Sequence, residues 1–308
     1  MNSFENSEES KTASRLVLGT AQLGMPYGIA NSTGQPDFEV AVSIIKTAWE
    51  YGIREFDTAQ AYGESEAVLG RALLSLGISN DVRIITKLDP KLELNKGQKI
   101  KRAINGSIER LQIPSLYGLM LHREEWLDNL NNGLEKTLRA LVLDGTVQHL
   151  GVSLYTPVKA LRALESDILD MIQVPANILD HRFADAGVFN LADEKGKLVY
   201  IRSVFLQGLL LMKPEDLQAN MAFAKPALTK LDFLCNQYKL TPNRLALLYI
   251  KQKYTQGKVV FGAEMSEQII QNMEDFNGNL PEALMNEINS IFSDAREDLI
   301  DPSKWPTQ

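Results

Sequence analysis

Four residues of four chemical types stand near the ends of short apolar segments. Asp57 lies in EFDTA and Tyr62 follows it, while Lys87 and His122 lie in VRIITKL and LYGLMLH. A tyrosine can give its proton to a carbonyl oxygen, but its ordinary pKa of about 10 makes it a weak acid at neutral pH. We expect the Lys87 ammonium to lower the pKa of Tyr62, and Asp57 to hold the lysine. With His122 orienting the carbonyl, the set predicts proton transfer without a metal.

Each of these residues also has an ordinary structural interpretation. Asp, Tyr and Gly form common turns, so Asp57 could simply cap a loop. Lys87 could be a surface lysine, and His122 a partly buried histidine that is satisfied by the core. The coincidence of all four at neighbouring segment ends favours a common site over four separate structural roles.

Eight short apolar segments alternate with helical patterns along the chain. They cover residues 16–22, 55–59, 82–88, 116–122, 149–154, 171–177, 198–205 and 258–263. Short apolar strands followed by helices are typical of a parallel sheet that is buried on both faces. No GxGxxG or Walker A motif is present. The sequence therefore predicts a single-domain α/β fold, a (β/α)8 TIM barrel, whose strand ends converge at one mouth.

Several helical patterns begin at residues that cap helices. Asp37, Thr156, Thr241 and Ser266 stand at such starts, where their side chains can accept hydrogen bonds from backbone amides. Residues 124–145 are expected to form one long helix.

The motifs FDTAQAYG, TK and LH, in this order along the barrel, resemble the aldo-keto reductase superfamily. The resemblance extends from Leu16 to about residue 276, and all four positions of the family's catalytic tetrad are matched. It implies that Tyr62 is the general acid, Lys87 its pKa partner, Asp57 the partner of the lysine, and His122 the substrate-orienting residue. It also implies a nicotinamide cofactor, NADPH or NADH, bound across the barrel mouth without a Rossmann domain.

The resemblance further implies contacts with that cofactor along the later strands. Ser153, Gln173 and Asn177 match positions that hold the nicotinamide carboxamide. SVFLQGL resembles a segment that wraps the pyrophosphate, and FGAEMSEQIIQN resembles an adenosine site. The expected cofactor-binding residues are Gly19, Thr20, Ser153, Gln173, Asn177, Arg202, Ser203, Phe205, Leu206, Gln207, Gly208, Gly262, Ala263, Glu264, Gln268 and Asn272.

Two residues depart from the family pattern. Arg202 stands where the family often has an aromatic residue, and its guanidinium could stack on a ring or bind substrate or phosphate. Glu264 stands where many members contact the adenosine 2′-phosphate. An acid there would repel a phosphate and could accept a hydrogen bond from a free ribose hydroxyl. The family favours NADPH, with Lys213 as a candidate compensating contact, but NADH stays open.

Composition bounds the class of protein. The 308 residues carry a net charge of −7, which gives no support for nucleic-acid binding. The single cysteine, Cys235, allows no internal disulfide. Residues 1–14 are polar and unlike a secretory signal, and no stretch approaches a membrane span. We therefore expect a cytoplasmic protein with a flexible segment over 1–14, and over 15–308 a barrel with a C-terminal extension.

The leading hypothesis is an NAD(P)H-dependent oxidoreductase that reduces an aldehyde or ketone, with a sugar carbonyl as one option. The alternatives are a cofactor-binding regulatory protein on the same barrel, or a non-redox isomerase or lyase. Substrate, reaction direction and oligomeric state are left open by the sequence. We expect the loop over residues 24–36, the segment after His122 and the tail with Trp305 to shape the substrate pocket.

Overall fold

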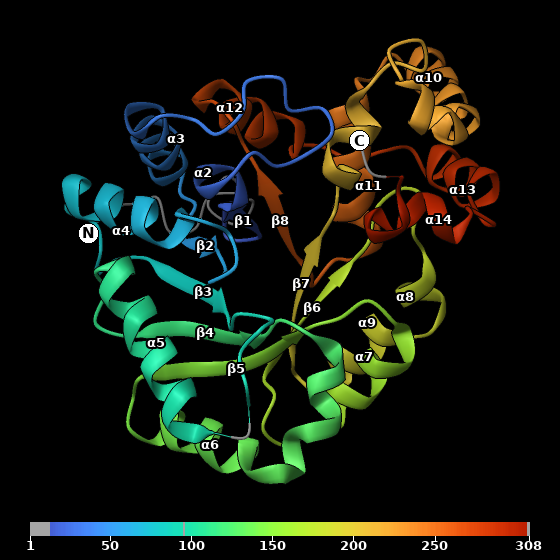
Figure 1. Cartoon of the computed structure of the whole chain (residues 1–308). Helices are drawn as coiled ribbons and strands as arrows, with labels where there is room; N and C mark the ends of the chain where they lie inside the picture. Colours follow the sequence, from blue (N-terminus) through green and yellow to red (C-terminus); the bar gives the residue numbers. More distant parts are fainter. Residues whose placement is uncertain (1–12, 95, 307–308) are drawn as a thin grey trace.

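The predicted barrel is confirmed. The computed structural model describes residues 13–94 and 96–306. For Asn131 and Asn132 it describes the backbone alone. Eight parallel strands pair in chain order, and the last pairs with the first to close the barrel (Figure 1). The strands are β1 (Leu16–Gly19), β2 (Glu55–Asp57), β3 (Arg83–Lys87), β4 (Leu116–Leu121), β5 (Val147–Ser153), β6 (Met171–Pro175), β7 (Leu198–Arg202) and β8 (Lys258–Gly262).

Helices surround the strands on the outside of the barrel (Figure 1). Their apolar faces pack against the strands, as the spacing of three and four residues predicts. The longer ones are α3 (Phe38–Glu50), α4 (Ser65–Leu76), α5 (Gly97–Leu111), α6 (Glu135–Leu143), α7 (Pro157–Leu164), α10 (Lys225–Tyr238), α11 (Pro242–Lys253), α12 (Ser266–Asp275) and α13 (Glu282–Ile291). The shorter ones are α2 (Ala21–Gly24), α8 (Arg182–Asp185), α9 (Val188–Glu194) and α14 (Glu297–Ile300). Among the described residues, no helix is long and apolar enough to cross a membrane.

The barrel interior and its amino end are filled by side chains. A small buried cluster comes from six of the strands: Val17, Ile85, Met120, Met171, Tyr200 and Val260. At the amino end of β2, the buried Glu55 carboxylate accepts a hydrogen bond of 3.0 Å from Tyr200 Oη. The same carboxylate pairs with Arg83 at 3.2 Å and with Lys258. Because this end is packed and paired, the opposite mouth is the place for a site.

The prediction of one long helix over residues 124–145 is wrong. The segment divides into a 3-10 helix (Glu124–Asn129), a π-helical turn (Leu130–Leu134) and α6. Gly133 has a φ of 88°, which a regular α-helix cannot contain. Glu124, at the start, turns its carboxylate to the backbone amides of Tyr155 and Thr156.

Two of the four predicted helix caps are confirmed by a side-chain hydrogen bond. Asp37 accepts from the Val40 amide at 2.9 Å, and Thr241 accepts from the Arg244 amide at 3.2 Å. Thr156 stands at the N-cap of α7, but its side chain caps no amide of that helix.

The prediction that Ser266 caps α12 is wrong. Met265 occupies the cap position and Ser266 is the first helical residue. The side chain of Gln268 instead accepts a hydrogen bond of 2.7 Å from the Glu264 amide, just before the helix. A glutamine reaching back from the first turn satisfies a free amide as a cap would, so the serine is not needed.

The expected flexible segment over residues 1–14 falls mostly outside the described residues. Of its last two residues, Ala13 is buried and Ser14 is exposed.

Candidate active site

The structure brings the four predicted catalytic residues together at the carboxyl ends of the strands. Asp57 ends β2, Lys87 ends β3, His122 directly follows β4, and Tyr62 lies in the loop before α4. Lys87 Nζ donates to Asp57 Oδ2 at 2.6 Å and to the Thr58 carbonyl at 3.0 Å. With 1% and 5% of their side chains exposed, lysine and aspartate form a buried ion pair.

Tyr62 lies against both the ion pair and the histidine. Its ring stands edge-on to the His122 ring, with the centroids 6.0 Å apart and an interplanar angle of 86°. Lys87 Nζ is 5.2 Å from the centroid of the Tyr62 ring. A phenol, an ammonium and an imidazole therefore meet at one point of the mouth.

The expectation of a lowered pKa for Tyr62 is wrong for this structure. Burial raises the pKa of Tyr62 above its ordinary value, and the charge of Asp57 raises it further, while Arg202 opposes the rise. The ammonium of Lys87 is offset by its own aspartate at 2.6 Å. Tyr62 is consequently a neutral phenol at physiological pH, which is the protonated form that a proton donor needs.

His122 is uncharged at neutral pH. Burial lowers the pKa of His122 to about 4, and the charges of Lys87 and Arg202 act in the same direction. Its Nδ1 atom is buried and has no hydrogen-bond partner among the described residues. The site therefore presents a neutral imidazole beside a neutral phenol.

Gln173 holds the second oxygen of Asp57. Its Nε2 atom donates to Asp57 Oδ1 at 2.8 Å, and the residue is buried. Asp57 is thus fixed on one side by Lys87 and on the other by Gln173. This contact was not expected from the sequence, which assigned Gln173 to the nicotinamide carboxamide.

Hydroxyl groups fix the loops under Tyr62. The Thr20 amide donates to the Asp57 carbonyl at 2.9 Å. Ser65 Oγ lies 2.8 Å from Thr20 Oγ1 and 3.0 Å from Thr58 Oγ1, and all three side chains are buried. These bonds link β1, β2 and the start of α4, so the Tyr62 loop is anchored at both ends.

A pocket extends from Tyr62 to the start of α12. Asp57 and Tyr62 line it together with residues of β1, β7, β8 and α12. Its amide side chains, from Gln22, Asn31, Gln173, Gln207, Asn243, Gln268 and Asn272, can both donate and accept, as a nucleotide requires. Of the expected cofactor residues, those that line it are Gly19, Thr20, Gln173, Arg202, Ser203, Phe205, Gln207, Gly208, Gly262, Glu264, Gln268 and Asn272.

The backbone after β7 forms a turn of unusual shape along this pocket. Ser203, Leu206, Gln207 and Gly208 all have positive φ, from 49° to 91°. A Cβ on Gly208 would lie 2.7 Å from Ala30 Cβ, so a side chain there would collide with the first loop. Such a turn brings the backbone close to a ligand, which suits the expected pyrophosphate segment.

Four expected cofactor residues are buried and do not line the pocket: Ser153, Asn177, Leu206 and Ala263. Asn177 is used within the protein. Its side-chain amide donates to the Ser203 carbonyl at 3.2 Å, and its oxygen accepts from the backbone amides of Leu179 and Asp180. In this arrangement Asn177 holds the turn after β7.

The first loop contributes pocket residues that motif matching did not identify. Tyr27, Gly28, Ala30 and Asn31 line the pocket, and burial raises the pKa of Tyr27 to about 12. The only sequence signal was the length and polarity of the loop over residues 24–36. Trp305 does not line the pocket, and its indole donates to the Leu299 carbonyl at 3.1 Å.

Asn243 was also missed. It donates to Asn272 Oδ1 at 2.9 Å and to Asp275 Oδ2 at 2.8 Å. It lies at the start of α11, where a polar residue after Thr241 and Pro242 looks like ordinary helix surface. Because Asn272 is held in this way, the expected adenosine end of the pocket has a fixed polar wall.

A barrel of this topology, with this set of residues at its mouth, defines a class of carbonyl-reducing enzymes, and the comparisons with known proteins agree. The sequence model of the Aldo/keto reductase family matches residues 15–292. The chain belongs to the aldo/keto reductase family, and it is an NAD(P)H-dependent oxidoreductase.

Two relatives show the range within this family. An NADH-specific methylglyoxal reductase of Escherichia coli is 27% identical, over 88% of this chain and 92% of that protein. A Schizosaccharomyces pombe protein, provisionally named voltage-gated potassium channel subunit beta, is 26% identical over 83% of this chain and 85% of its own. The solved glycerol dehydrogenase of Gluconobacter oxydans shares the fold, with a TM-score of 0.71, 22% identity and 94% of each chain covered.

Proposed function

We propose that the protein reduces an aldehyde or ketone to an alcohol, with Tyr62 as the general acid. The observation that carries this proposal is the buried Asp57–Lys87 pair beside Tyr62 and His122, at one end of a pocket that continues to Gln268. When a reduced nicotinamide cofactor is bound there, it supplies the hydride that the carbonyl carbon receives.

The residues of the chain supply the proton and the orientation. Tyr62 Oη donates its proton to the carbonyl oxygen, and the Lys87 ammonium stabilises the phenolate that forms. His122, as a neutral imidazole, donates a hydrogen bond to the same oxygen and positions it. Asp57 and Gln173 hold the lysine in place. One hydride and one proton are added, so the products are the alcohol and the oxidised cofactor.

The experiment is a turnover assay on the purified protein. NADPH or NADH is mixed with a panel of aldehydes, ketones and sugars, and nicotinamide absorbance is followed. Oxidation of the cofactor that depends on the carbonyl compound is the expected result. Cofactor binding without turnover of any carbonyl would contradict the proposal. It would favour a cofactor-binding regulatory protein, the alternative on the same barrel; the Schizosaccharomyces pombe relative is named as a channel subunit. A cytoplasmic location stays a prediction.

For the cofactor, we propose a preference for NADH that is set by Glu264. Glu264 lines the pocket beside Gln268 and Asn272, and burial raises the pKa of its carboxyl. A partly buried carboxylate opposes a 2′-phosphate by charge and can accept a hydrogen bond from a ribose hydroxyl. This proposal departs from the family expectation of NADPH.

The dissociation constants of NADH and NADPH at one salt concentration test this proposal. Glu264→Ser or Glu264→Arg should move the ratio toward NADPH by about one to two powers of ten, the worth of one charge-assisted contact. Glu267→Ser is the matched control, because Glu267 is exposed and lies three residues further on, in the first turn of α12. An unchanged ratio in both Glu264 variants would show that this residue does not read the cofactor.

A further inference from the structure

The pocket holds one cation without a counter-charge. Among the described residues that line it, the carboxylates and basic side chains are Asp57, Glu264 and Arg202. Asp57 is neutralised by Lys87 at 2.6 Å, and Glu264 lies at the other end, beside Gln268. No carboxylate of the described part of the chain forms an ion pair with Arg202, and its hydrogen bonds go to neutral oxygens.

The guanidinium of Arg202 is held in a defined position with most of its donors unused. Its Nη2 donates to the Leu154 carbonyl at 3.1 Å and its Nη1 to Ser203 Oγ at 3.2 Å. The Tyr155 ring lies under it, with Cζ 4.4 Å from the ring centroid. Its Nε is buried and has no hydrogen-bond partner in the described part of the chain. Since a guanidinium has five N–H donors, this arrangement keeps hydrogen-bonding capacity for a ligand.

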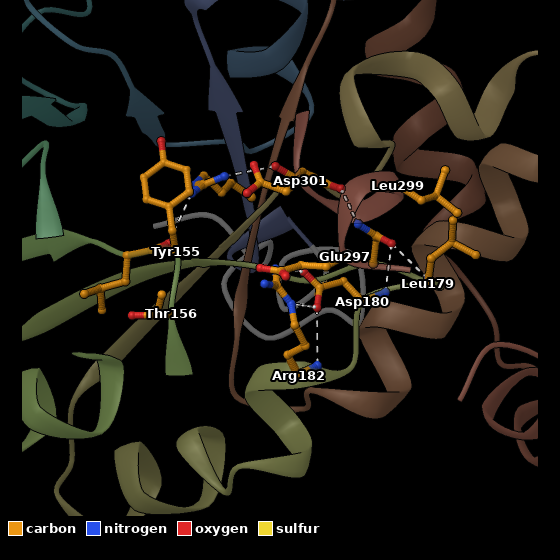
Figure 2. Close-up of polar contacts among 12 residues, drawn as sticks. Tyr155, Thr156, Leu179, Asp180, Arg182, Glu297, Leu299 and Asp301 are labelled. Carbon is orange, nitrogen blue, oxygen red and sulfur yellow. Dashed lines mark hydrogen bonds and ion pairs between the residues drawn. The ribbon is translucent and has the colours of Figure 1, made fainter. Parts of the chain in front are cut away.

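The loop that carries Tyr155 is itself fixed. The Glu124 carboxylate accepts from the Tyr155 amide at 2.7 Å and from the Thr156 amide at 3.0 Å, and Thr156 Oγ1 donates to it as well. Glu124 is buried and stands two residues after His122. Figure 2 shows Tyr155 and Thr156 beside each other on this loop. The aromatic support of Arg202 is therefore tied to the segment that positions His122.

The charge of Arg202 faces the catalytic end of the pocket. It opposes the rise in the pKa of Tyr62 and of Tyr27, and it contributes to the lowered pKa of His122. Tyr62 and His122 are the residues proposed to contact the reacting carbonyl, and Tyr27 lines the same pocket as Tyr62. The expected adenosine end, at Gln268 and Asn272, is built by other residues.

We propose that Arg202 binds an anionic group of the substrate, so that the preferred substrate is a carbonyl compound that also carries a carboxylate or a phosphate. This inference rests on the proposed carbonyl reduction. A planar guanidinium matches either anion with paired hydrogen bonds, and it gains little from a neutral alkyl or hydroxyl group. A partly buried cation with unused donors in the same pocket as Tyr62 would select such a substrate.

Matched substrate pairs test the proposal. Succinic semialdehyde and butanal differ by a carboxylate, while glyceraldehyde 3-phosphate and glyceraldehyde differ by a phosphate. Values of kcat/KM are measured at one salt concentration for wild type and for Arg202→Met, which keeps length but removes charge. Arg123→Met is the matched control, because that exposed arginine pairs with Glu125. The dissociation constant of the cofactor is measured for every variant.

In wild type we expect the anionic member of one pair to be preferred, and that pair identifies the anion as carboxylate or phosphate. Arg202→Met should lower this preference about tenfold to a hundredfold, whereas Arg123→Met should keep it. A preference that is absent in wild type, or unchanged in Arg202→Met, overturns the proposal. Loss of cofactor affinity alone in Arg202→Met also overturns the proposal, because it would show that Arg202 binds the cofactor.

A failure of the proposed reduction would be recognised separately, as no turnover of any of the four compounds by wild type. Binding of butyrate and of butanamide to the protein with oxidised cofactor is then measured by calorimetry. Preference for butyrate that is lost in Arg202→Met supports the anion site. Equal binding of the acid and the amide overturns it.

Discussion

Replacing Lys87 by methionine separates the structural from the chemical role of the buried ion pair. Methionine fills a similar volume but removes the ammonium. Asp57 then keeps one hydrogen bond, from Gln173 at 2.8 Å, and loses the one from Lys87 at 2.6 Å. With 5% of its side chain exposed, its carboxylate has little access to water that could replace the lost partner.

The expected loss of stability follows from that burial. Removing one partner of a buried ion pair costs about 3–5 kcal/mol, because the other charge is left uncompensated. In the double variant Lys87→Met/Asp57→Asn no charge is stranded, and we expect most of this loss to be recovered. The reduction rate should behave differently. Without the ammonium, the phenolate of Tyr62 forms beside no cation, so both variants should stay about tenfold to a hundredfold slower than wild type.

Urea unfolding followed by tryptophan fluorescence measures the free energy of unfolding, and stopped-flow mixing with saturating cofactor measures the chemical step. Lys87→Met should be the less stable and slower of the two variants, since it keeps a bare aspartate near Tyr62. A double variant that recovers the rate together with the stability would refute the reasoning, because Lys87 would then be only a structural partner of Asp57.

Two further predictions concern the rings. Tyr62→Phe should lower carbonyl reduction about 10²–10⁴-fold while cofactor still binds, since only the acidic proton is lost; near-wild-type single-turnover rates would exclude Tyr62 as the acid. His122 should titrate by NMR near pH 4, because burial and the charges of Lys87 and Arg202 lower its pKa to about 4. In the unfolded chain the ordinary pKa of a histidine is about 6.5. As the pH falls from about 6.5 to about 4, wild type should therefore lose up to about 3 kcal/mol of stability relative to His122→Asn. Titration of His122 near its ordinary pKa would contradict this prediction.

Much of the fold could be predicted because its signals are local and repeated. Each of the eight strands is a short buried run followed by an apolar helical stripe. An error in the assignment of one segment would therefore not have changed the prediction of a barrel. The prediction of one long helix over residues 124–145 was wrong because Gly133 interrupts the helical backbone, although the apolar pattern of the segment was read correctly. Propensity is a weak guide where one residue with positive φ divides a segment.

The tetrad could be located because barrel topology places the ends of β2, β3 and β4 side by side. The partners that set its electrostatics could not be located in the same way. Gln173 comes from β6 and reaches across the barrel to Asp57, a contact separated by 116 residues. The raised pKa of Tyr62 depends on how completely the phenol is buried, which spacing along the chain does not report.

The turn after β7 shows why the least predictable part of the chain lies on the pocket. Ser203, Leu206 and Gln207 are not glycines, yet all have positive φ, which costs about 1–2 kcal/mol per residue. Contacts with a distant loop offset this conformational free energy. One of them is the hydrogen bond of 3.0 Å from the Ile29 amide to the Gln207 carbonyl. Backbone held in this way by its surroundings gathers at ligand sites. Because Leu206 and Gln207 are not residue types that favour positive φ, only the resemblance to a reductase family could indicate this segment from sequence.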